Sequence, residues 1–470
     1  MNGYDKEPLI GVGLMTNTQQ ARLSLSARYI TEAGEPLGAG SYVAQSAGGK
    51  VLLTGEAAGG QVKALEMLRL SPTDFDSCRV TIDDVTIGID FHWQRQEAQQ
   101  FQGALLIKAG KEGLTIINEL PLEAYLVSVI SSEMSAACPP ELLRAHAVVS
   151  RSWLLAQLAQ AVETTGAVTI AASDRDDKTA ASQSHSHAAS EAVAPLEIIR
   201  WYGRESHSDF DVCADDHCQR YQGISKAFSP AAFNAVRDTR GKAMVWDGAI
   251  CDTRYSKSCG GVTEVYRAAW EDRDVPYLAT VYDGDADLAA YPMPLTDEAN
   301  AESWIRAAPQ AFCNTRSKEL LARILPGFDQ ETPDFYRWRV RYAADELRAL
   351  IESRLGLDVG RIQSLEPLER GQSGRIIRLQ IRGERRTLVI GKELEIRRAL
   401  SRSHLYSSAF VVDTDAGDAE YPQGFTLIGA GWGHGVGLCQ IGAAVMADRG
   451  YLHSEILAHY FPGAQLQSLY

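Results

Sequence analysis

Short segments in which apolar and polar positions alternate dominate the first 118 residues, and glycine separates many of them. The clearest are SYVAQ, KVLLTGE and CRVTIDDVTIGIDF between residues 40 and 90. Residues 103–118, GALLIKAGKEGLTIIN, predict a hairpin that turns at Gly110–Gly113. A repeat of two residues is typical of half-buried strands. The pattern therefore predicts that residues 1–118 form a mostly β region that packs on the rest of the chain.

Alternation gives way to longer apolar stretches at residues 119–158, ELPLEAYLVSVISSEMSAACPPELLRAHAVVSRSWLLAQL. We interpret the Val- and Ile-bearing part from Leu122 to Ile130 as a strand that leads to the motif SSEM. Pro139 and Pro140 then open a helix, because proline is tolerated at the first helical position and apolar residues follow at three- and four-residue steps. The stretch therefore predicts a strand-to-helix unit.

Two later segments differ from this body. Residues 171–194 are small and polar, which is typical of an exposed, mobile insertion. His185 and His187 lie there, and we interpret them as solvated rather than metal-bound. Residues 297–400 combine helical patterns, notably ADELRALIESRLGL, with strands separated by glycine turns. They predict an inserted α+β lobe.

The remaining segments form one core, to which residues 119–296 contribute the first part and residues 401–470 the last. The last part is apolar and rich in glycine, and it ends in a helix near Ser454–Tyr460. The predicted fold class is α+β, with a mixed, β-rich body, a strand-to-helix unit and an inserted α+β lobe.

Composition narrows the function classes. With 470 residues, 45% hydrophobic and 23% charged, the chain has the composition of an ordinary globular protein with more than one domain. A net charge of −14 argues against nucleic acids and anionic membranes as partners. No apolar run is long enough to span a membrane, and the N-terminus MNGYDKEPLIGVGLMTN lacks the pattern of an export signal. Eight cysteines are too sparse for a disulfide scaffold and leave the redox compartment undecided.

The SSEM motif offers a candidate proton donor. Glu133 lies between small and apolar side chains at a junction of packed elements, where partial desolvation would suit it to donate a proton near neutral pH. The alternative is a carboxylate that caps or solvates a helix start, and this stretch alone favours that alternative. Arg151 on the following helix could orient a carboxylate or hold a polar substrate group; otherwise it forms an interhelical salt bridge.

A second candidate is the motif CADDHC. Cys213, His217 and Cys218 offer two thiolates and an imidazole to a Zn²⁺ ion, with water or a distant group in the fourth position. The alternatives are a disulfide between Cys213 and Cys218 or two free thiols, and the spacing alone does not choose among them.

The motif YSKSCGG could in principle carry a nucleophilic serine. Neither the GxSxG elbow nor the helical SxxK spacing accompanies it, however. A glycine turn that displays hydroxyl groups and a phenol for hydrogen bonding to carbohydrate is an equally good interpretation. The candidate contacts are Tyr255, Ser256, Ser258, Gly260 and Gly261.

Alternating glycines mark the motif GAGWGHGVGLCQIG, residues 429–442. It is not a dinucleotide fingerprint, because no GxG is followed by glycine at the required position. The glycines permit close backbone approach or positive φ, and Trp432, His434 and Gln440 would then contact a sugar by stacking and hydrogen bonding. The alternative is a tight structural loop.

Taken together and in this order, the motifs resemble the stage II sporulation protein D family, also called the SpoIID/LytB or amidase-enhancer group. The matching segments are LEAYLVSVISSEM, PPELLRAHAVVSRSW, CADDHCQRYQG, YSKSCGG with VPYL, and GWGHGVGLCQIGAAVMADRGYLHSEILAHYFPG. They cover about residues 100–470, and IGVGLMTN near the N-terminus also fits.

The resemblance implies a bacterial lytic transglycosylase that cleaves peptidoglycan between N-acetylmuramic acid and N-acetylglucosamine and leaves 1,6-anhydro-muramyl ends. Glu133 matches the family's catalytic acid/base, and Arg151 and Tyr255 match its neighbouring motif positions. Some members bind zinc through a cluster like Cys213, His217 and Cys218. The family acts outside the cytoplasm, in the periplasm or cell envelope, so we expect export by a signal that this sequence does not contain.

The chain departs from the family's usual motifs at two places near Glu133. The usual SEMP is SEMSAACPP here, which adds Cys138, and His146 stands where glutamine is typical. These changes bear on substrate preference more than on the reaction.

Three functions fit these residues. The first is the lytic transglycosylase, in which one carboxylate suffices because the substrate's own 6-hydroxyl replaces the water that glycosidases activate with a second carboxylate. The second is a non-catalytic glycan-binding activator of a cell-wall amidase. The third is a zinc hydrolase, which ranks last because thiolate-rich zinc sites are more often structural.

Overall fold

The structure is a computed structural model. It describes residues 6–55, 60–88, 94–134, 137–166, 195–202, 207, 209–215, 217–225, 230–285, 291–325, 334–415 and 420–470. The insertion expected at residues 171–194, with His185 and His187, lies outside these residues. Within the described part of the chain, no helix is both long enough and apolar enough to cross a membrane.

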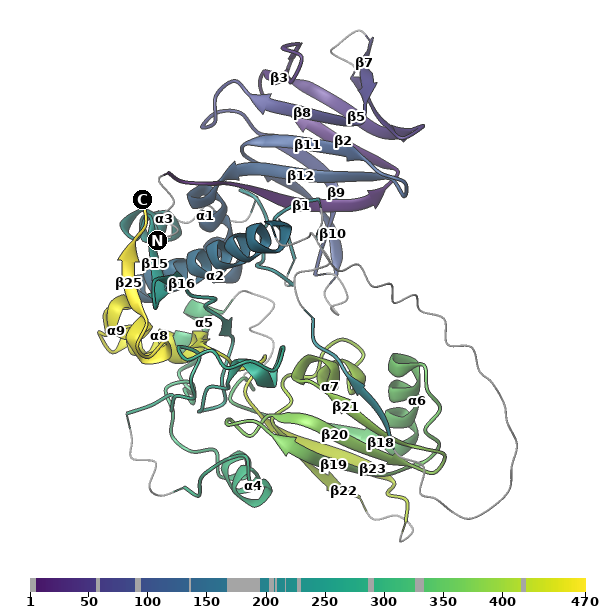
Figure 1. The fold of residues 1–470 in the computed structure, drawn as a ribbon, viewed down its shortest axis with the longest axis vertical. Helices are drawn as coiled ribbons and strands as arrows, with labels where there is room; N and C mark the ends of the chain where they lie inside the picture. The colour runs from purple at the N-terminus through teal and green to yellow at the C-terminus, as the bar shows by residue number, and fades with distance from the viewer. Residues whose placement is uncertain are drawn as a thin grey trace.

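The N-terminal region forms two sheets around a shared core, at the top of Figure 1. One sheet has the order β14 (Val212–Cys213), β1 (Leu9–Thr18), β12 (Leu114–Pro121), β11 (Ala104–Ala109), β8 (Met67–Pro72), β3 (Tyr29–Thr31), β4 (Pro36–Leu37). The other has the order β10 (Arg95–Phe101), β9 (Val80–Ile87), β2 (Gln20–Leu25), β5 (Gly40–Ala47), β6 (Lys50–Gly55), β7 (Gly60–Leu65).

Alternation along these strands places every second residue in the core. In β2, for example, Ala21, Leu23 and Leu25 are buried and the residues between them are exposed. The predicted hairpin is present, because β11 pairs antiparallel with β12 and Gly110 N–H donates to Gly113 O at 2.7 Å. The described residues from Leu9 to Pro121 thus form strands β1 to β12 and their connections.

The segment from Leu122 to Ile130 is a helix, so its interpretation as a strand is wrong. Helix α1 (Leu122–Glu133) follows β12 directly and buries Leu122, Tyr125 and Val129. These positions recur at steps of three and four residues, which suits one face of a helix. Burial on nearly every side outweighs the β preference of Val and Ile, which reflects packing more than an intrinsic backbone preference.

The predicted helix after the double proline is present as α2 (Pro140–Gly166), which packs against α1 in the centre of the molecule. The C-terminal end of the chain returns to this body. The elements that complete the body are α3 (Pro230–Asp238), β15 (Lys242–Trp246), β16 (Ala249–Ile250), β17 (Tyr255–Ser256), the 3-10 turn η1 (Tyr266–Ala268), α5 (Lys318–Ile324), β24 (Leu438–Cys439), α8 (Gln440–Asp448), α9 (His453–Tyr460) and β25 (Gln465–Ser468).

The lobe has its own apolar core and lies below the body in Figure 1. One of its sheets has the order β13 (Leu196–Ile199), β21 (Thr387–Gly391), β20 (Ile376–Gly383), β19 (Ile362–Arg370). The other has the order β18 (Arg337–Ala343), β23 (Gly424–Ala430), β22 (Phe410–Thr414). Its helices are α4 (Glu298–Ala307), α6 (Ala344–Leu355) and α7 (Glu393–Ala399). Strands β13, β22 and β23 come from outside residues 297–400. The α+β fold class with a β-rich body is confirmed.

A buried arginine joins the lobe to the body. Arg375 follows the β19 strand in the turn before β20 and is fully buried. Its Nη1 donates to Cys259 O at 2.9 Å, and its Nη2 donates to Gly433 O at 3.0 Å. A guanidinium has five N–H donors and no acceptor, so it needs carbonyl oxygens around it when it is buried. The two glycine motifs of the sequence supply them.

A buried carboxylate holds the other side of the same turn. Glu264 Oε1 accepts from the Gln372 N–H at 2.9 Å, and Glu264 Oε2 accepts from the Ser373 N–H at 3.0 Å and its hydroxyl at 2.7 Å. Ser373 Oγ in turn accepts from Arg375 Nη1 at 2.9 Å. The turn therefore lies in a continuous polar network in the interior, of the kind that fixes one arrangement of the surrounding backbone.

The packing of Arg375 explains two of the alternating glycines. Gly431 and Gly435 both have a φ of +76°, which strains any residue with a Cβ. A Cβ at Gly435 would lie 2.4 Å from Arg375 Cζ, and one at Gly431 would lie 2.9 Å from its Nη2. Both properties expected of these glycines, positive φ and close approach, are present, and the approaching group is a side chain of the lobe.

Substitution of Gly435 tests this packing. Gly435→Ala adds both backbone strain and a clash with Arg375, whereas Gly356→Ala adds only strain, since its φ is +68° and nothing lies within 4 Å of its Cβ position. We expect about 1–2 kcal/mol of destabilisation from strain in both variants and about 1–3 kcal/mol more from overpacking in Gly435→Ala. Urea unfolding measures both, and equal losses would contradict the role of Arg375.

Candidate functional site

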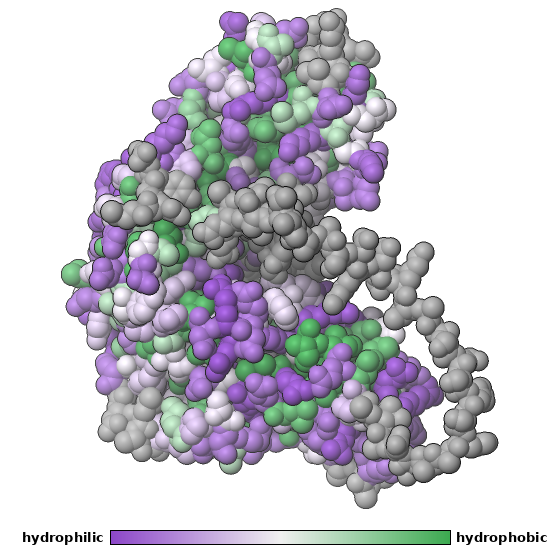
Figure 2. All heavy atoms as spheres, viewed as in Figure 1, coloured by the Kyte–Doolittle hydropathy of each residue, from purple (hydrophilic) through white to green (hydrophobic). Residues whose placement is uncertain are grey.

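A cavity of about 1830 Å³ lies where the N-terminal sheets, the body and the lobe meet. In Figure 2 the outline of the molecule is hollowed between the N-terminal region and the lobe. The wall takes residues from β1 and β9, from the end of α1, from the β17 strand and from α7 of the lobe. The site is thus built by segments that are far apart in the sequence.

Glu133 is the last residue of α1 and lies on the cavity wall. Its Oε1 accepts from the Arg220 backbone N–H at 3.2 Å and from the Tyr255 hydroxyl at 3.4 Å. Its exposed fraction is 9%, so it is largely desolvated. The other described carboxylates on the wall are more exposed: Asp84, Asp209, Asp215 and Glu271. Glu133 therefore lies where the end of α1 meets the segments that carry Arg220 and Tyr255.

Tyr255 is fixed by a buried histidine. The rings of Tyr255 and His146 have centroids 4.6 Å apart. His146 is fully buried, and burial, with a smaller effect of the Lys257 charge, lowers its pKa to about 3. The ring is therefore neutral near pH 7. Its Nε2 accepts from the Gln440 amide at 3.0 Å, which leaves Nδ1–H to donate to Ser150 Oγ at 3.3 Å.

These contacts give roles to residues whose place was open. His146 packs and orients Tyr255 but supplies no proton near neutral pH. The Gln440 amide, expected to contact substrate, reaches the wall but is bonded to His146. Cys138 is buried and lies against α5, with its Sγ 3.6 Å from Arg323 O.

Arg151 does not reach the cavity, so its assignment beside the catalytic residue is wrong. It is fully buried, and its Nε and Nη2 donate to the two carboxylate oxygens of Glu123 at 2.9 and 2.6 Å. Its Nη1 donates to Lys242 O at 3.0 Å. The interhelical salt bridge considered as the alternative is present, and it ties α2 to the start of α1 and to β15.

The YSKSCGG motif divides into a cavity half and a buried half. Ser256 lies on the wall, and its Oγ has no hydrogen-bond partner among the described residues. Ser258 is fully buried, and a Cβ at Gly261 would lie 2.8 Å from Trp304 Cζ2. Gly260 packs against the backbone of Gly431. The expectation that Ser258, Gly260 and Gly261 face a sugar is wrong, because close packing between two glycine loops buries them.

Trp432 and His434 both line the cavity. Trp432 is half-buried and packs against Tyr406, with ring centroids 4.4 Å apart. His434 Nδ1 accepts from the Val436 N–H at 3.0 Å, and burial lowers its pKa well below the ordinary value. Its ring lies edge-on to Trp270, 4.9 Å away. His434 is therefore neutral near pH 7, while Trp432 packs against both Tyr406 and Phe335 and stays partly exposed.

Sequence analysis missed several cationic residues of the wall. Arg254 lies over the Trp270 ring at 4.3 Å and pairs with Asp252 at 2.8 Å. Its neighbour Tyr255 was singled out, but cation–π stacking depends on tertiary contacts that no local pattern reveals. Among the described residues, seven Lys or Arg side chains line the cavity against five Asp or Glu, although acidic residues outnumber basic ones by 60 to 46 in the chain. The cavity is therefore the less acidic part of the protein.

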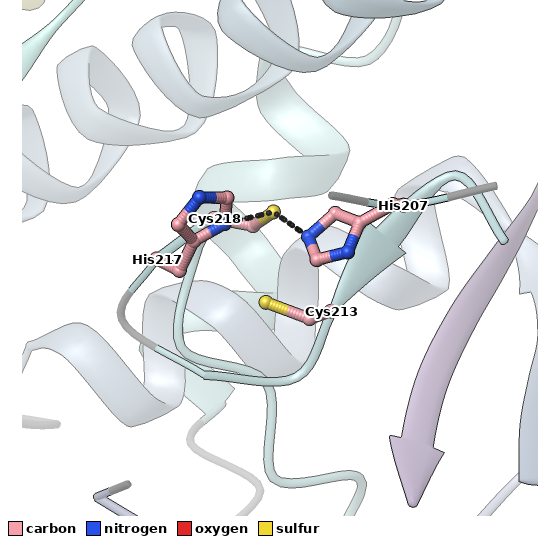
Figure 3. A group of neighbouring side chains, drawn as sticks. All are labelled: His207, Cys213, His217 and Cys218. Carbon is pink, nitrogen blue, oxygen red and sulfur yellow. Dashed lines mark hydrogen bonds between the residues drawn. The ribbon is translucent and has the colours of Figure 1, made fainter. Parts of the chain in front are cut away.

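Four potential metal ligands lie together on the same wall. Figure 3 shows the side chains of His207, Cys213, His217 and Cys218 converging, and their ligand atoms lie within 4.8 Å of one another. Cys218 Sγ lies 3.3 Å from His207 Nε2 and 3.5 Å from His217 Nδ1. Three of these residues were predicted. His207 is the fourth, which the spacing within CADDHC could not reveal because it precedes the motif.

The donor set fits Zn²⁺, which binds thiolates and imidazoles in tetrahedral sites. Hydrogen bonds from Cys218, His207 and His217 lower the pKa of Cys213, which favours the thiolate that a metal requires. All eight cysteines are free thiols here, so the alternative of a disulfide between Cys213 and Cys218 is not present. Four protein donors close the coordination sphere, as in structural zinc sites.

The loop that carries the cluster also reaches Glu133. Arg220, whose N–H bonds Glu133, follows Cys218 by two residues. Residues on either side of Arg220 bond to helix α1. Gln219 Oε1 accepts from the Tyr125 hydroxyl at 3.2 Å, and Gln222 N–H donates to Ser128 Oγ at 3.3 Å. A group that fixes the Cys213–Cys218 loop therefore fixes one donor to Glu133.

Comparison with known proteins identifies two regions. Residues 110–246 match the family model described as "Stage II sporulation protein", and residues 264–437 match a domain of unknown function, DUF8618. Residues 110–246 are therefore similar to stage II sporulation proteins. The predicted resemblance to the stage II sporulation protein D family is thereby confirmed.

The similar proteins are distant. The chain is 22% identical over 350 residues to the stage II sporulation protein D of Bacillus amyloliquefaciens, covering 74% of this chain and 75% of that protein. It is 20% identical over 372 residues to that of Bacillus subtilis (strain 168), covering 78% and 82%. An amidase enhancer of Bacillus subtilis (strain 168) is 23% identical over 251 residues, 50% of this chain but only 32% of the enhancer's own length. The region that matches the family model, residues 110–246, contains Glu133 and the His207–Cys218 cluster.

The buried pair of Arg151 and Glu123 is expected to stabilise the domain. Arg151→Met leaves Glu123, whose side chain is 12% exposed, without its cation and should cost about 3–5 kcal/mol. Arg144→Met on the same helix removes half-exposed pairs with Glu141 and Asp238 and should cost at most about 1 kcal/mol. Chemical unfolding distinguishes the two, and similar losses would contradict the assignment.

The low pKa of His146 predicts a pH dependence of stability. The folded state keeps His146 neutral down to about pH 3, while the unfolded chain binds a proton below about pH 6.5. Stability is therefore lost as the pH falls, by about 2 kcal/mol for this residue between pH 7 and pH 5. His146→Gln should reduce the loss by that amount in urea unfolding at the two pH values. The same loss in both proteins would contradict the neutral, buried state.

Proposed function

We propose that this protein is a lytic transglycosylase that cleaves peptidoglycan glycan strands between N-acetylmuramic acid and N-acetylglucosamine. The observation that carries the proposal is the state of Glu133, the buried carboxylate of a cavity wall, held by donors from two other segments. Similarity to stage II sporulation proteins D and to an amidase enhancer supports a role in the cell wall, and therefore outside the cytoplasm.

In the proposed reaction Glu133 acts first as an acid and then as a base. It protonates the glycosidic oxygen as the bond to the muramyl C1 breaks. The resulting carboxylate then takes the proton of the muramyl 6-hydroxyl, whose oxygen forms the new bond to C1. The 1,6-anhydro ring results, and Glu133 is again protonated. The reaction consumes no water and requires no second carboxylate. This agrees with the single buried carboxylate among the described residues of the wall.

The neighbours of Glu133 suit this task. Arg220 N–H and the Tyr255 hydroxyl both bond Oε1, and no donor among the described residues bonds Oε2. The exchangeable proton therefore belongs on Oε2. Fixing one oxygen restricts the rotation of the carboxyl group, and such orientation matters because proton transfer requires hydrogen-bond geometry with the substrate.

The wall also suits a glycan that carries carboxylates. Trp432 places a partly exposed aromatic ring on the cavity wall. Sugars stack on aromatic faces through their C–H groups while hydroxyl groups bond at their edges. Arg254 and the other cationic residues match the lactyl carboxylate that each muramyl unit carries.

We propose that His207, Cys213, His217 and Cys218 bind Zn²⁺, which would hold the loop that leads to Arg220. Because four protein donors leave no position for water, this arrangement favours a structural ion over the zinc hydrolase considered above.

Glu133→Gln tests the catalytic role directly. Glutamine keeps an oxygen to accept from Arg220 and Tyr255 but cannot transfer a proton, so release of anhydro-muropeptides from peptidoglycan should fall about 10²- to 10⁴-fold. Glu302→Gln, on the exposed face of α4, is the matched control and should retain full release. Mass spectrometry of the products measures both, and undiminished release by Glu133→Gln would refute the assignment.

The alternative function is a non-catalytic glycan-binding activator of a cell-wall amidase, which the name of the amidase enhancer favours. Glycan strands stripped of stem peptides distinguish the two functions. The transglycosylase produces new anhydro ends on them, whereas an activator binds them without producing new ends and accelerates a separately added amidase.

A further inference from the structure

A second group of potential metal ligands lies in the interior, apart from the cavity. Cys259, Asp283, Cys313 and Cys439 have ligand atoms that all lie within 4.8 Å of one another. Each residue is at most 2% exposed. The four come from different segments: the turn after β17, the loop after η1, the segment before α5, and the end of β24. Their convergence is a property of the fold, since no short motif contains two of them.

The spacing of the sulfur atoms fits one metal ion. Cys259 Sγ and Cys313 Sγ lie 3.7 Å apart. Two thiolates bound to one tetrahedral Zn²⁺ at about 2.3 Å are separated by about 3.8 Å. A disulfide requires about 2.05 Å, and an iron–sulfur cluster places inorganic atoms between its cysteines and needs wider spacing. The observed separation is that of neighbouring ligands of a mononuclear site.

Backbone donors point at the ligand atoms. Cys259 N–H donates to Cys439 Sγ at 3.2 Å, Gly261 N–H donates to Cys259 Sγ at 3.4 Å, and Cys313 N–H donates to Asp283 Oδ2 at 2.9 Å. Hydrogen bonds of this kind favour the ionised forms of thiols and carboxyls, and they orient the ligands of metal sites. The surrounding backbone is therefore arranged for anionic ligands.

The hydrogen bonds of the buried Asp283 carboxyl group come from neutral groups. Among the described residues, no Lys, Arg or His forms an ion pair with Asp283, whose Oδ1 accepts instead from the Tyr460 hydroxyl. Burial of polar groups at this depth is costly unless a compensating charge is present, and a divalent cation supplies it.

We propose that Cys259, Asp283, Cys313 and Cys439 bind one structural Zn²⁺ ion. Thiolate sulfur and carboxylate oxygen are both zinc ligands, and four protein donors complete a tetrahedral sphere. Cys439 is part of β24 and pairs with Ser256 of β17, the strand that carries Tyr255, and Cys259 follows β17 by three residues. The ion would therefore stabilise the strand pair behind the cavity without contacting substrate.

The experiment isolates this site from the cluster on the cavity wall. The double variant Cys213→Ser/His217→Ala removes two of that cluster's donors and serves as the background. After dialysis against metal-free buffer, it should retain about one zinc per chain, and zinc X-ray absorption should show about three sulfur and one oxygen neighbours. Adding Asp283→Asn or Cys313→Ser should abolish retention, whereas Cys251→Ser, a buried cysteine outside both groups, should not.

The wild-type protein gives an independent measurement that needs no variant. A chelator should remove the zinc of the partly exposed cavity cluster first and leave the buried ion, with its sulfur-rich absorption spectrum. Retention of this second ion supports the proposal. Purified wild-type protein that lacks this second zinc ion overturns the proposal. This holds if intact mass shows a disulfide among Cys259, Cys313 and Cys439, and equally if thiol titration of the denatured protein shows that all three are free.

Discussion

The burial of one guanidinium determines how the lobe meets the body. Arg375 must satisfy its N–H groups without water, because unbonded donors and an isolated charge in the interior cost several kcal/mol. The carbonyls of Cys259 and Gly433 satisfy them, so both glycine loops must hold fixed backbone positions. Glycine at positions 431 and 435 leaves the necessary space. These loops are therefore shaped by a side chain of the protein before any ligand arrives.

This constraint extends to Glu133. The loop fixed by Arg375 leads into β24, and β24 pairs with β17, the strand that carries Tyr255. Tyr255 donates to Glu133 from one side, while Arg220, just beyond the Cys213–Cys218 loop, donates from another. Oε1 of Glu133 is thus held from two directions. Tyr255 belongs to the strand pair that depends on Arg375 of the lobe, and Arg220 follows the loop that carries Cys213 and Cys218. Displacement of either support would alter the orientation of the same group.

Local periodicity allowed the N-terminal strands and the helices α2, α6 and α9 to be predicted from the sequence. Motif order singled out Glu133, which lies on the cavity wall. The sequence misled at Leu122–Ile130, where β-branched residues suggested a strand although their burial in a helix decides the structure. Arg151 was misplaced for a different reason. A motif position shows that an arginine is near the site in sequence, but only the fold shows that it faces Glu123.

Residues that the sequence could not reveal share one property, which is that their partners lie far along the chain. His207 joins the cluster from before the motif, Arg254 stacks on Trp270, and Cys259 meets Cys313 and Cys439 only after the body has folded.

Most of the cysteines lie in the two groups of potential metal ligands. Five of the eight belong to the two groups that also contain histidine or aspartate, and none forms a disulfide. Adjacent thiols outside the cytoplasm are prone to oxidation, since disulfides persist in that environment. Metal coordination lowers this tendency, because a thiolate that donates its electron pair to a cation is less available to attack an oxidant. Two metal groups would therefore keep clustered cysteines reduced in an oxidising environment. They would hold the loop beside Glu133 and the strand pair behind it, the two places on which its orientation depends.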